Sequence, residues 1–263
     1  MYKTCPKCGH TRALSGNEAK DHCPQCGLVY RKWFNRRFRK NRKLSKDAGF
    51  ASAAGDLSLV DRLRELFLAV KPETSRPAFY ARCLVFAGML AWGWKFISMD
   101  YYTILDGVRI NIALPEIYQS FLHNVNLIFH EAGHILFLPF GRFMSILGGS
   151  LMQILMPLTV MLVFLLKERN TFGAAIGLWW TAQNFMDVAS YINDARAGHI
   201  PLLGGGTGVD RPGMHDWRNI LSELDMLSND YLLAGIVDGL GTLLMLTSLV
   251  WGALVLFQQY KNL

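Results

Sequence analysis

Long apolar stretches dominate the chain after residue 78 and alternate with short polar breaks. A membrane-spanning helix needs about 20 mostly apolar residues in a row. Four stretches come close to that length: Phe79–Ser98, Met144–Leu166, Phe172–Ile192 and Leu232–Phe257. A fifth, Ile117–Phe140, is long enough but more polar. The pattern predicts an all-α polytopic membrane protein with about five transmembrane helices.

A different pattern precedes the first long stretch. In Leu57–Val70 the apolar residues, among them Leu63 and Phe67, recur with the period of a helix, and charged residues occupy the opposite face. Such a helix lies on a membrane surface more readily than it crosses the membrane. We therefore predict an interfacial helix at residues 57–71, followed by a transmembrane helical domain at 78–263.

Positive charge is concentrated in one segment. The chain has a formal charge of +7, and Arg31–Lys46 alone holds nine lysines and arginines and no acidic residue. Positively charged flanks stay in the cytoplasm, so we expect an integral protein of the plasma (inner) membrane with a cytoplasmic N-terminus. The segment, within a juxtamembrane linker at 31–56, suits anionic lipid headgroups. Its interleaved aromatic residues also fit nucleic acid, which we regard as the less favoured partner.

Four of the five cysteines form two C-x-x-C pairs: Cys5, Cys8, Cys23 and Cys26. Two such pairs with fourteen residues between them match a four-cysteine zinc ribbon, which we place at residues 1–30. Gly9 and Gly27 follow the pairs and allow the backbone to fold back toward the sulfurs. Two disulfides would be the alternative, but they need an oxidising compartment. A ribbon of this kind also suits a protein partner.

The stretch "HEAGHILF" contains an H-E-x-x-H motif. On a helix, residues four apart share a face, so His130 and His134 can bind one zinc ion. Glu131 then reaches the metal-bound water as a general base. The alternative is a pair of buried histidines with a paired glutamate. His123 and Asn126 continue the same face, and we expect His123 to support a ligand or face the substrate.

Catalytic zinc needs a third protein ligand and one open position. If the first span leaves the cytoplasm, the motif helix returns inward and ends near the cytoplasmic surface. Residues at the same depth come from the Phe172–Ile192 helix and the loop after it. They are Asn184, Asp187, Tyr191, Asp194, His199 and His215, with Asp238 in the last span as a further candidate.

The motif helix resembles that of the site-2 proteases, which are intramembrane zinc metalloproteases. A closer resemblance covers about residues 120 to 230, through "HEAGHILF", "GRFMSILGGSLMQILMP", "YINDARA", "IPLLGG" and "HDW". These segments are similar to a family of bacterial polytopic membrane proteins, some of which carry an N-terminal zinc ribbon. The family pattern emphasises Asp194, His215 and Asp216. The resemblance implies that the remaining metal ligand is Asp194 or His215, ahead of Asp187.

Each of these residues also has a structural interpretation. Asp194 can form a salt bridge with Arg196, His215 can order the "HDW" turn through Asp216, and Asp187 can orient a histidine.

The function predicted is a zinc-dependent intramembrane metalloprotease, with one structural and one catalytic zinc ion. Zinc-activated water would attack a peptide bond of a membrane-protein substrate near the cytoplasmic face, with Glu131 as the general base. Two alternatives remain. One is a non-proteolytic zinc membrane protein, such as another hydrolase, a transporter or a sensor. The other is a membrane-anchored adaptor whose working part is the zinc ribbon.

Overall fold

The computed structural model describes residues 4–5, 7–11, 22–29, 58–70, 75–98, 103–105, 108–110, 117–118 and 120–263. The chain divides into two units, Met1–Arg62 and Leu63–Leu263, and each is considered by itself. The basic segment Arg31–Lys46 lies outside the described residues, so its predicted contact with lipid stays a prediction.

The chain is mostly helical. Its N-terminal part has the helices α2 (Leu59–Leu68) and α3 (Arg76–Ile97), followed by an antiparallel hairpin of β1 (Thr103–Leu105) and β2 (Val108–Ile110). The motif region has α4 (Phe121–Phe137), η1 (Leu138–Phe140), α5 (Arg142–Leu162) and its π-helical continuation η2 (Val163–Lys167). The remainder has α6 (Thr171–Asn193), η3 (Pro212–Met214), α7 (Asp216–Glu223), η4 (Leu227–Asn229) and α8 (Asp230–Tyr260).

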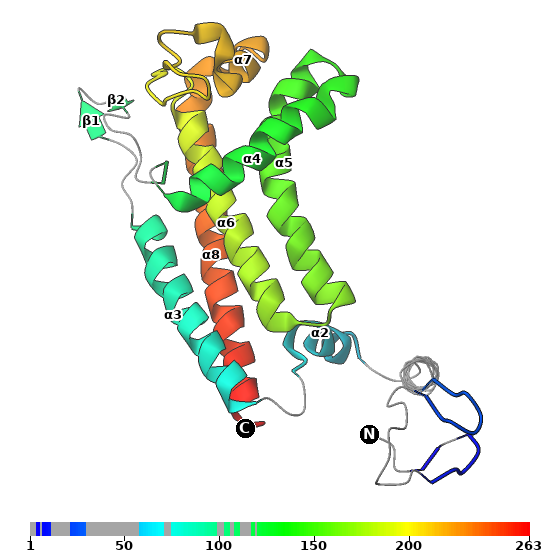
Figure 1. Cartoon of the computed structure of the whole chain (residues 1–263). Helices are drawn as coiled ribbons and strands as arrows, with labels where there is room; N and C mark the ends of the chain where they lie inside the picture. Colours follow the sequence, from blue (N-terminus) through cyan, green and yellow to red (C-terminus); the bar gives the residue numbers. More distant parts are fainter. Residues whose placement is uncertain are drawn as a thin grey trace. The chain divides into compact units, whose positions relative to one another are not determined.

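Helix α6 is the centre of the second unit. Of its 23 residues 18 are buried, and α3, α5 and α8 pack around it (Figure 1). Because neighbouring helices cover nearly all of its surface, α6 can carry amide and carboxylate side chains that a lipid-facing helix could not. The polar residues of α6 are therefore available to a site inside the bundle.

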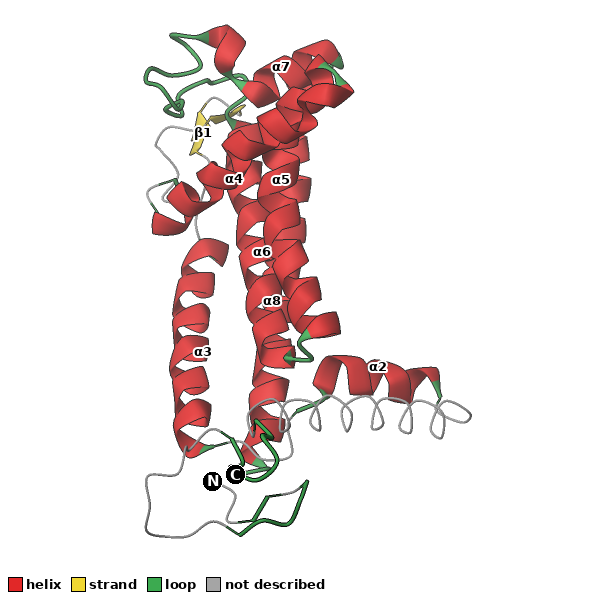
Figure 2. Ribbon diagram, turned by 45° about the vertical axis from the view of Figure 1, so that its right-hand side comes forward, coloured by secondary structure: helices red, strands yellow, loops and turns green. Residues whose placement is uncertain are grey.

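The long helices have two common ends, which are defined by two clusters of buried side chains. Near α2, Phe79 at the start of α3 packs with Phe172 at the start of α6 and Val255 near the end of α8. At the other end, Ile192 of α6 packs with Ala234 at the start of α8. We call these the α2 end and the α7 end. Helices α5 and α8 run from the α7 end to the α2 end, and α3 and α6 run the opposite way (Figures 1 and 2).

The motif helix α4 does not return across the bundle as the sequence led us to expect. It begins beside the middle of α6, where Asn126 contacts Gln183, and it ends beside the start of α5, where His134 contacts Ser145. Figure 1 shows α4 inclined to the long helices. The motif therefore lies at the α7 end, whereas α3 begins at the α2 end.

The expectation of five membrane-spanning helices is corrected to two. Among the described residues, Arg142–Lys167 and Leu227–Tyr260 are long and apolar enough to cross a membrane. The other three predicted spans do not meet this criterion of length and composition. Helix α4 has only 17 residues and carries the polar motif, α3 is diluted by Arg82 and Lys95, and α6 is rich in buried polar groups.

Candidate metal centre

Helix α4 brings the motif residues to one face. Ser120 caps its N-terminus by accepting a hydrogen bond from the Leu122 N–H, which satisfies one of the free donors of the first turn. The rings of His130 and His134 then lie one turn apart, with their centroids 4.9 Å from each other. His130 is buried and His134 is half-buried. The predicted helical pairing of the two histidines is present in the structure.

Hydrogen bonds on the far side of each imidazole fix its orientation. Nδ1 of His130 lies 3.0 Å from Oε1 of Gln153, and Nδ1 of His134 lies 2.9 Å from the carbonyl oxygen of Ser145. Because both acceptors are oxygens, each Nδ1 carries the proton. Both Nε2 atoms point to the same place, and each would offer its lone pair to a metal ion bound there. This is the arrangement that metal-binding histidines have in proteins.

Asp216 completes the set at the first residue of α7. Its Oδ2 lies 2.9 Å from Nε2 of His130 and 3.3 Å from Nε2 of His134. Ligand atoms at about 2.0–2.2 Å around a tetrahedral zinc ion lie about 3.4 Å apart, and the three atoms, all within 4.8 Å of one another, are close enough to share one ion. Burial raises the pKa of Asp216, but the hydrogen bonds with the two histidines outweigh burial and lower the pKa below its ordinary value.

Glycines allow α5 to approach the two imidazoles closely. A Cβ atom at Gly149 would lie 2.6 Å from Nε2 of His130 and 2.8 Å from Nε2 of His134. One turn along α4, a Cβ atom at Gly133 would lie 2.1 Å from the carbonyl oxygen of Gly148. Side chains at these positions would separate α4 from α5 and fill the space beside the ligand atoms. The "GGS" segment is thus a packing requirement of the site.

Glu131 is the part of the motif that remains free. Its carboxylate is half-buried and makes no hydrogen bond or ion pair with any described residue. It lines a cavity of 570 Å³ together with His130, His134 and Asp216. The rest of the wall comes from α5, α6 and the loop before α7, and much of it is apolar. A carboxylate without a partner beside three potential metal ligands is available to accept a proton.

Asp194 and His215, which were predicted ahead of Asp187 as the remaining metal ligand, support the site from behind. Asp194 and His215 are fully buried, and Nε2 of His215 lies 3.2 Å from Oδ2 of Asp194. Nδ1 of His215 accepts the Arg218 N–H and so caps α7, which leaves neither nitrogen for a metal. The Asp194 carboxylate also accepts the N–H groups of His199 and Ile200. The structure thus joins Asp194 to His215, whereas Asp216 is the residue that reaches the motif histidines.

The structural interpretations of Asp194 and His215 are settled by the same contacts. Arg196 does not pair with Asp194, because its guanidinium binds both carboxylate oxygens of Asp230 at 2.8 Å. His215 does order the "HDW" turn, but through its bond with Asp194. Asp238, the further candidate in α8, is not among the residues that line the cavity.

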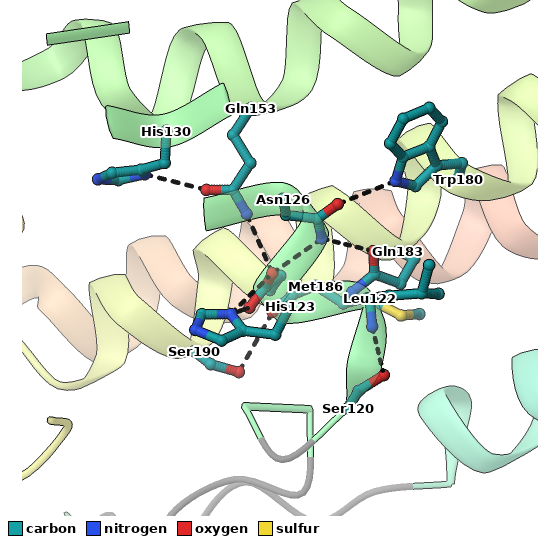
Figure 3. Close-up of polar contacts among 11 residues, drawn as sticks. Ser120, Leu122, His123, Asn126, His130, Gln153, Trp180, Gln183, Met186 and Ser190 are labelled. Carbon is teal, nitrogen blue, oxygen red and sulfur yellow. Dashed lines mark hydrogen bonds and ion pairs between the residues drawn. The ribbon is translucent and has the colours of Figure 1, made fainter. Parts of the chain in front are cut away.

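Asp187 lies behind His130 and reaches it through Gln153. The Gln153 Nε2 donates to Oδ2 of Asp187 at 3.0 Å, so the amide oxygen must face His130 (Figure 3). Asp187 also accepts hydrogen bonds from Asn126 at 3.0 Å and from His123 at 2.9 Å. The carboxylate therefore holds two residues of α4 and one of α5 in register. Orienting a histidine is thus the role that the structure supports for Asp187, in place of direct ligation.

Asp216 was missed as a ligand because the sequence gives it an ordinary role. An acidic residue in the first turn of a helix is favoured by the helix dipole alone. The available signal was its presence in the emphasised "HDW" segment, directly after a histidine that caps the helix. Its distance from the motif in the sequence gives no indication that the two meet.

The four cysteines of the first unit form a second candidate metal centre. Their sulfur atoms approach within 3.7 Å, between Cys5 and Cys26 and between Cys8 and Cys23. Tetrahedral zinc with Zn–S bonds of about 2.3 Å requires sulfurs about 3.75 Å apart. All four are free thiols, so the structure supports a metal site in place of disulfides. The two turns match, with positive φ angles of 73° at Gly9 and 66° at Gly27.

The protonation of these thiols also favours a cation. Burial raises the pKa of Cys5, but N–H groups of Cys8 and Lys7 outweigh burial and lower it to about 6. Although the His10 N–H favours the thiolate of Cys8, burial and the neighbouring sulfurs raise its pKa to about 12. Four clustered sulfurs cannot all ionise alone, and a divalent cation removes that conflict.

No protein-family model, curated protein or solved structure matches this chain.

Proposed function

We propose that the protein is a membrane-embedded zinc metallohydrolase that cleaves peptide bonds. The observation that carries this proposal is the convergence of three ligand atoms, from His130, His134 and Asp216, beside the free carboxylate of Glu131. Three protein ligands and an adjacent open cavity are typical of catalytic zinc, whereas structural zinc has four protein ligands. The four-cysteine cluster has that closed arrangement.

Each residue of the site has a separate role in the proposed reaction. When bound, zinc would polarise the scissile carbonyl and lower the pKa of a water molecule. Glu131 has the position and the free carboxylate of a general base, which would take a proton from water and return it to the leaving amine. Gln153 and the Ser145 carbonyl hold the two histidines in the tautomer that presents Nε2. The hydrogen bond from the Asp216 N–H to the Tyr191 hydroxyl, at 3.1 Å, holds the start of α7 in place.

A peptide substrate is favoured by the shape and lining of the cavity. A volume of 570 Å³ accommodates several residues of an extended chain, and the wall carries apolar side chains such as Leu127, Leu202 and Met214. An apolar segment of a membrane protein suits this lining. The resemblance of the motif helix to the site-2 proteases points to the same reaction.

The directions of the helices support a polytopic arrangement. Helices α5 and α8 are the two candidate spans, and both run from the α7 end to the α2 end. A chain that crosses a membrane twice in one direction must cross back between the two passages. Helix α6 is the only long helix in the described chain between them, and its polar groups are covered by its neighbours. We therefore infer that α6 crosses as well, and α3 runs beside it.

The same arrangement reverses the expected side of the site. The basic segment Arg31–Lys46 precedes α2 and α3 in the sequence, and positive flanks stay cytoplasmic. We therefore infer that the α2 end lies on the cytoplasmic side of the plasma membrane. The candidate metal centre then faces the opposite surface, because α4 lies at the α7 end. The cleaved bond would lie near the outer face and not near the cytoplasmic face.

Substrate trapping tests the proposed reaction. Glu131→Gln should keep the zinc ion and abolish turnover, so uncleaved membrane proteins should accumulate and remain bound to the variant. Glu65→Gln on the exposed surface of α2 is the matched control and should accumulate nothing. If Glu131→Gln binds zinc but the same proteins are processed at the wild-type rate, proteolysis by this site is excluded.

A further inference from the structure

A second cavity lies at the α2 end, far from the candidate metal centre. It has a volume of 190 Å³ and is bordered by the segment after α2, the start of α3, the turn between α5 and α6 and the end of α8. Its polar lining residues are Arg82, Glu168, Arg169, Asn170, Thr171 and Gln259. About 16 residues of α6 separate Thr171 from Asp187, which is about 24 Å along the helix. The two cavities are therefore separate sites.

Arg82 brings a positive charge into this cavity, and no described residue forms an ion pair with it. Its guanidinium is half-buried, and Nη1 donates to Oε1 of the buried Gln259 at 2.9 Å. A guanidinium has five N–H donors, and Gln259 is the one partner that Arg82 has among the described residues. Charged groups removed from water are normally paired. The remaining donors of Arg82 point to an anionic ligand.

Arg169 adds a second guanidinium to the same wall. It lies in the tight turn between α5 and α6 with a φ angle of +50°, which is uncommon for a residue with a side chain. Glu168 also borders the cavity, but it forms no ion pair with Arg82 or Arg169. Among the described residues, the cavity wall thus carries two guanidinium groups and one carboxylate. Its excess charge is positive.

The surrounding surface has the character of a membrane interface. The aromatic residues Tyr80 and Tyr260 are 62% and 64% exposed beside the cavity end of α3 and α8, and exposed tyrosines gather at the level of lipid headgroups. Helix α2 runs roughly perpendicular to the long helices at the end of the bundle where α5 ends (Figure 2), and its apolar residues Leu63 and Phe67 are exposed. The cavity therefore opens where a membrane would present its headgroups.

We propose that this cavity binds the phosphodiester group of an anionic phospholipid, of the phosphatidylglycerol type. Arg82 and Arg169 donate to the phosphate oxygens, a charge-assisted contact that suits the planar guanidinium. The acyl chains lie along the exposed apolar surface of α3, where Leu84 is 76% exposed. The site rests on the proposed membrane embedding of the bundle. It does not depend on the metal centre or on any hydrolytic activity.

Native mass spectrometry of the full chain, released from detergent, tests the site. Phosphatidylglycerol and phosphatidylcholine with identical acyl chains are added in parallel titrations. The wild type should retain one phosphatidylglycerol with at least about tenfold preference over phosphatidylcholine, because the two guanidinium groups repel the cationic choline that neutralises the same phosphate in phosphatidylcholine. Arg82→Gln/Arg169→Gln should lose that preference. Arg64→Gln/Arg76→Gln removes the same charge from exposed positions at the same end and should keep it.

Two further measurements separate loss of lipid binding from misfolding and from binding of a soluble anion. Arg169→Gln alone lies in an exposed turn and should weaken phosphatidylglycerol binding by about threefold while the thermal unfolding midpoint stays unchanged. Inorganic phosphate at millimolar concentration should not displace the lipid. Equal retention of the two lipids by the wild type overturns the proposal. So does an equal loss of preference in both double variants, or displacement by inorganic phosphate, which would indicate a soluble anion as the ligand.

Discussion

Oδ2 of Asp216 lies 2.9 Å from Nε2 of His130, although 86 positions separate the two residues in the sequence. This contact joins the start of α7 to the motif helix and extends a two-histidine motif to three potential metal ligands. It depends on the buried pair of Asp194 and His215, which caps α7 and fixes the direction in which Asp216 points.

Asp216→Asn is expected to lower the zinc affinity of the second unit by more than about 100-fold, because it removes the only anionic ligand of the set. Asp194→Asn and His215→Gln should cost less, about 10- to 100-fold, since they disturb only the support of Asp216. Zinc content after dialysis against a graded chelator series measures the order. Asp225→Asn is the matched control and should equal the wild type. A larger loss of zinc affinity in His215→Gln than in Asp216→Asn would identify His215 as the third ligand in place of Asp216.

Metal stoichiometry separates the two candidate centres. We expect two zinc ions per wild-type chain, one in His130→Ala/His134→Ala and one in Cys5→Ser/Cys8→Ser, because the two ligand sets share no residue. Elemental analysis of the purified chains gives these numbers directly. A wild type with a single zinc ion that is lost with the cysteines would contradict the metal centre of the motif.

The sequence predicted the parts of the site that depend on local spacing. The pairing of His130 with His134 follows from the helical repeat, and the clustering of the four cysteines follows from two tight turns. Neither depends on how the rest of the chain packs. The helix within Leu57–Val70 was predictable for the same reason, because its apolar residues recur with the helical period along the sequence.

The third ligand and the path of α4 depend on tertiary contacts and were not predictable in this way. The apolar pattern predicted a complete span at Ile117–Phe140, but the helix ends after 17 residues and lies obliquely against α5. The close approach requires glycine at 133, 148 and 149. Glycines in an apolar helix are common, so the pattern alone did not show that two helices meet there.

Gly149→Ala tests that close approach. The added methyl group would lie 2.6 Å from Nε2 of His130, which is closer than van der Waals contact allows. We expect a loss of stability of about 1–3 kcal/mol and loss of zinc from the second unit. Gly239→Ala in α8 has open space around it and is the control. Thermal unfolding and zinc content should change in the first variant and not in the second. Unchanged zinc content in Gly149→Ala would show that the histidines bind metal in another arrangement.

Asp187→Asn should change the geometry of the metal centre, although Asp187 does not contact the metal site directly. The neutral amide can no longer accept three hydrogen bonds as a carboxylate does, so Gln153 loses the contact that turns its oxygen toward His130. We expect a decrease in zinc affinity of about 10- to 100-fold with the fold retained. Cobalt substitution provides the readout, because the visible spectrum of bound Co²⁺ reports a change in ligand geometry. A spectrum and affinity equal to the wild type would limit Asp187 to packing.

The side of the membrane that the metal centre faces can be measured with two single cysteines. Leu203→Cys lies in the exposed loop at the α7 end, and Lys261→Cys lies at the α2 end. A membrane-impermeant maleimide should label Leu203→Cys in intact cells, because the proposed topology has that loop on the outer face. Lys261→Cys should react only after lysis, as should the wild-type chain, whose ribbon cysteines precede the basic segment. The reverse labelling pattern would put the metal centre on the cytoplasmic side and return the cleaved bond to the inner face, while leaving the ligand set unchanged.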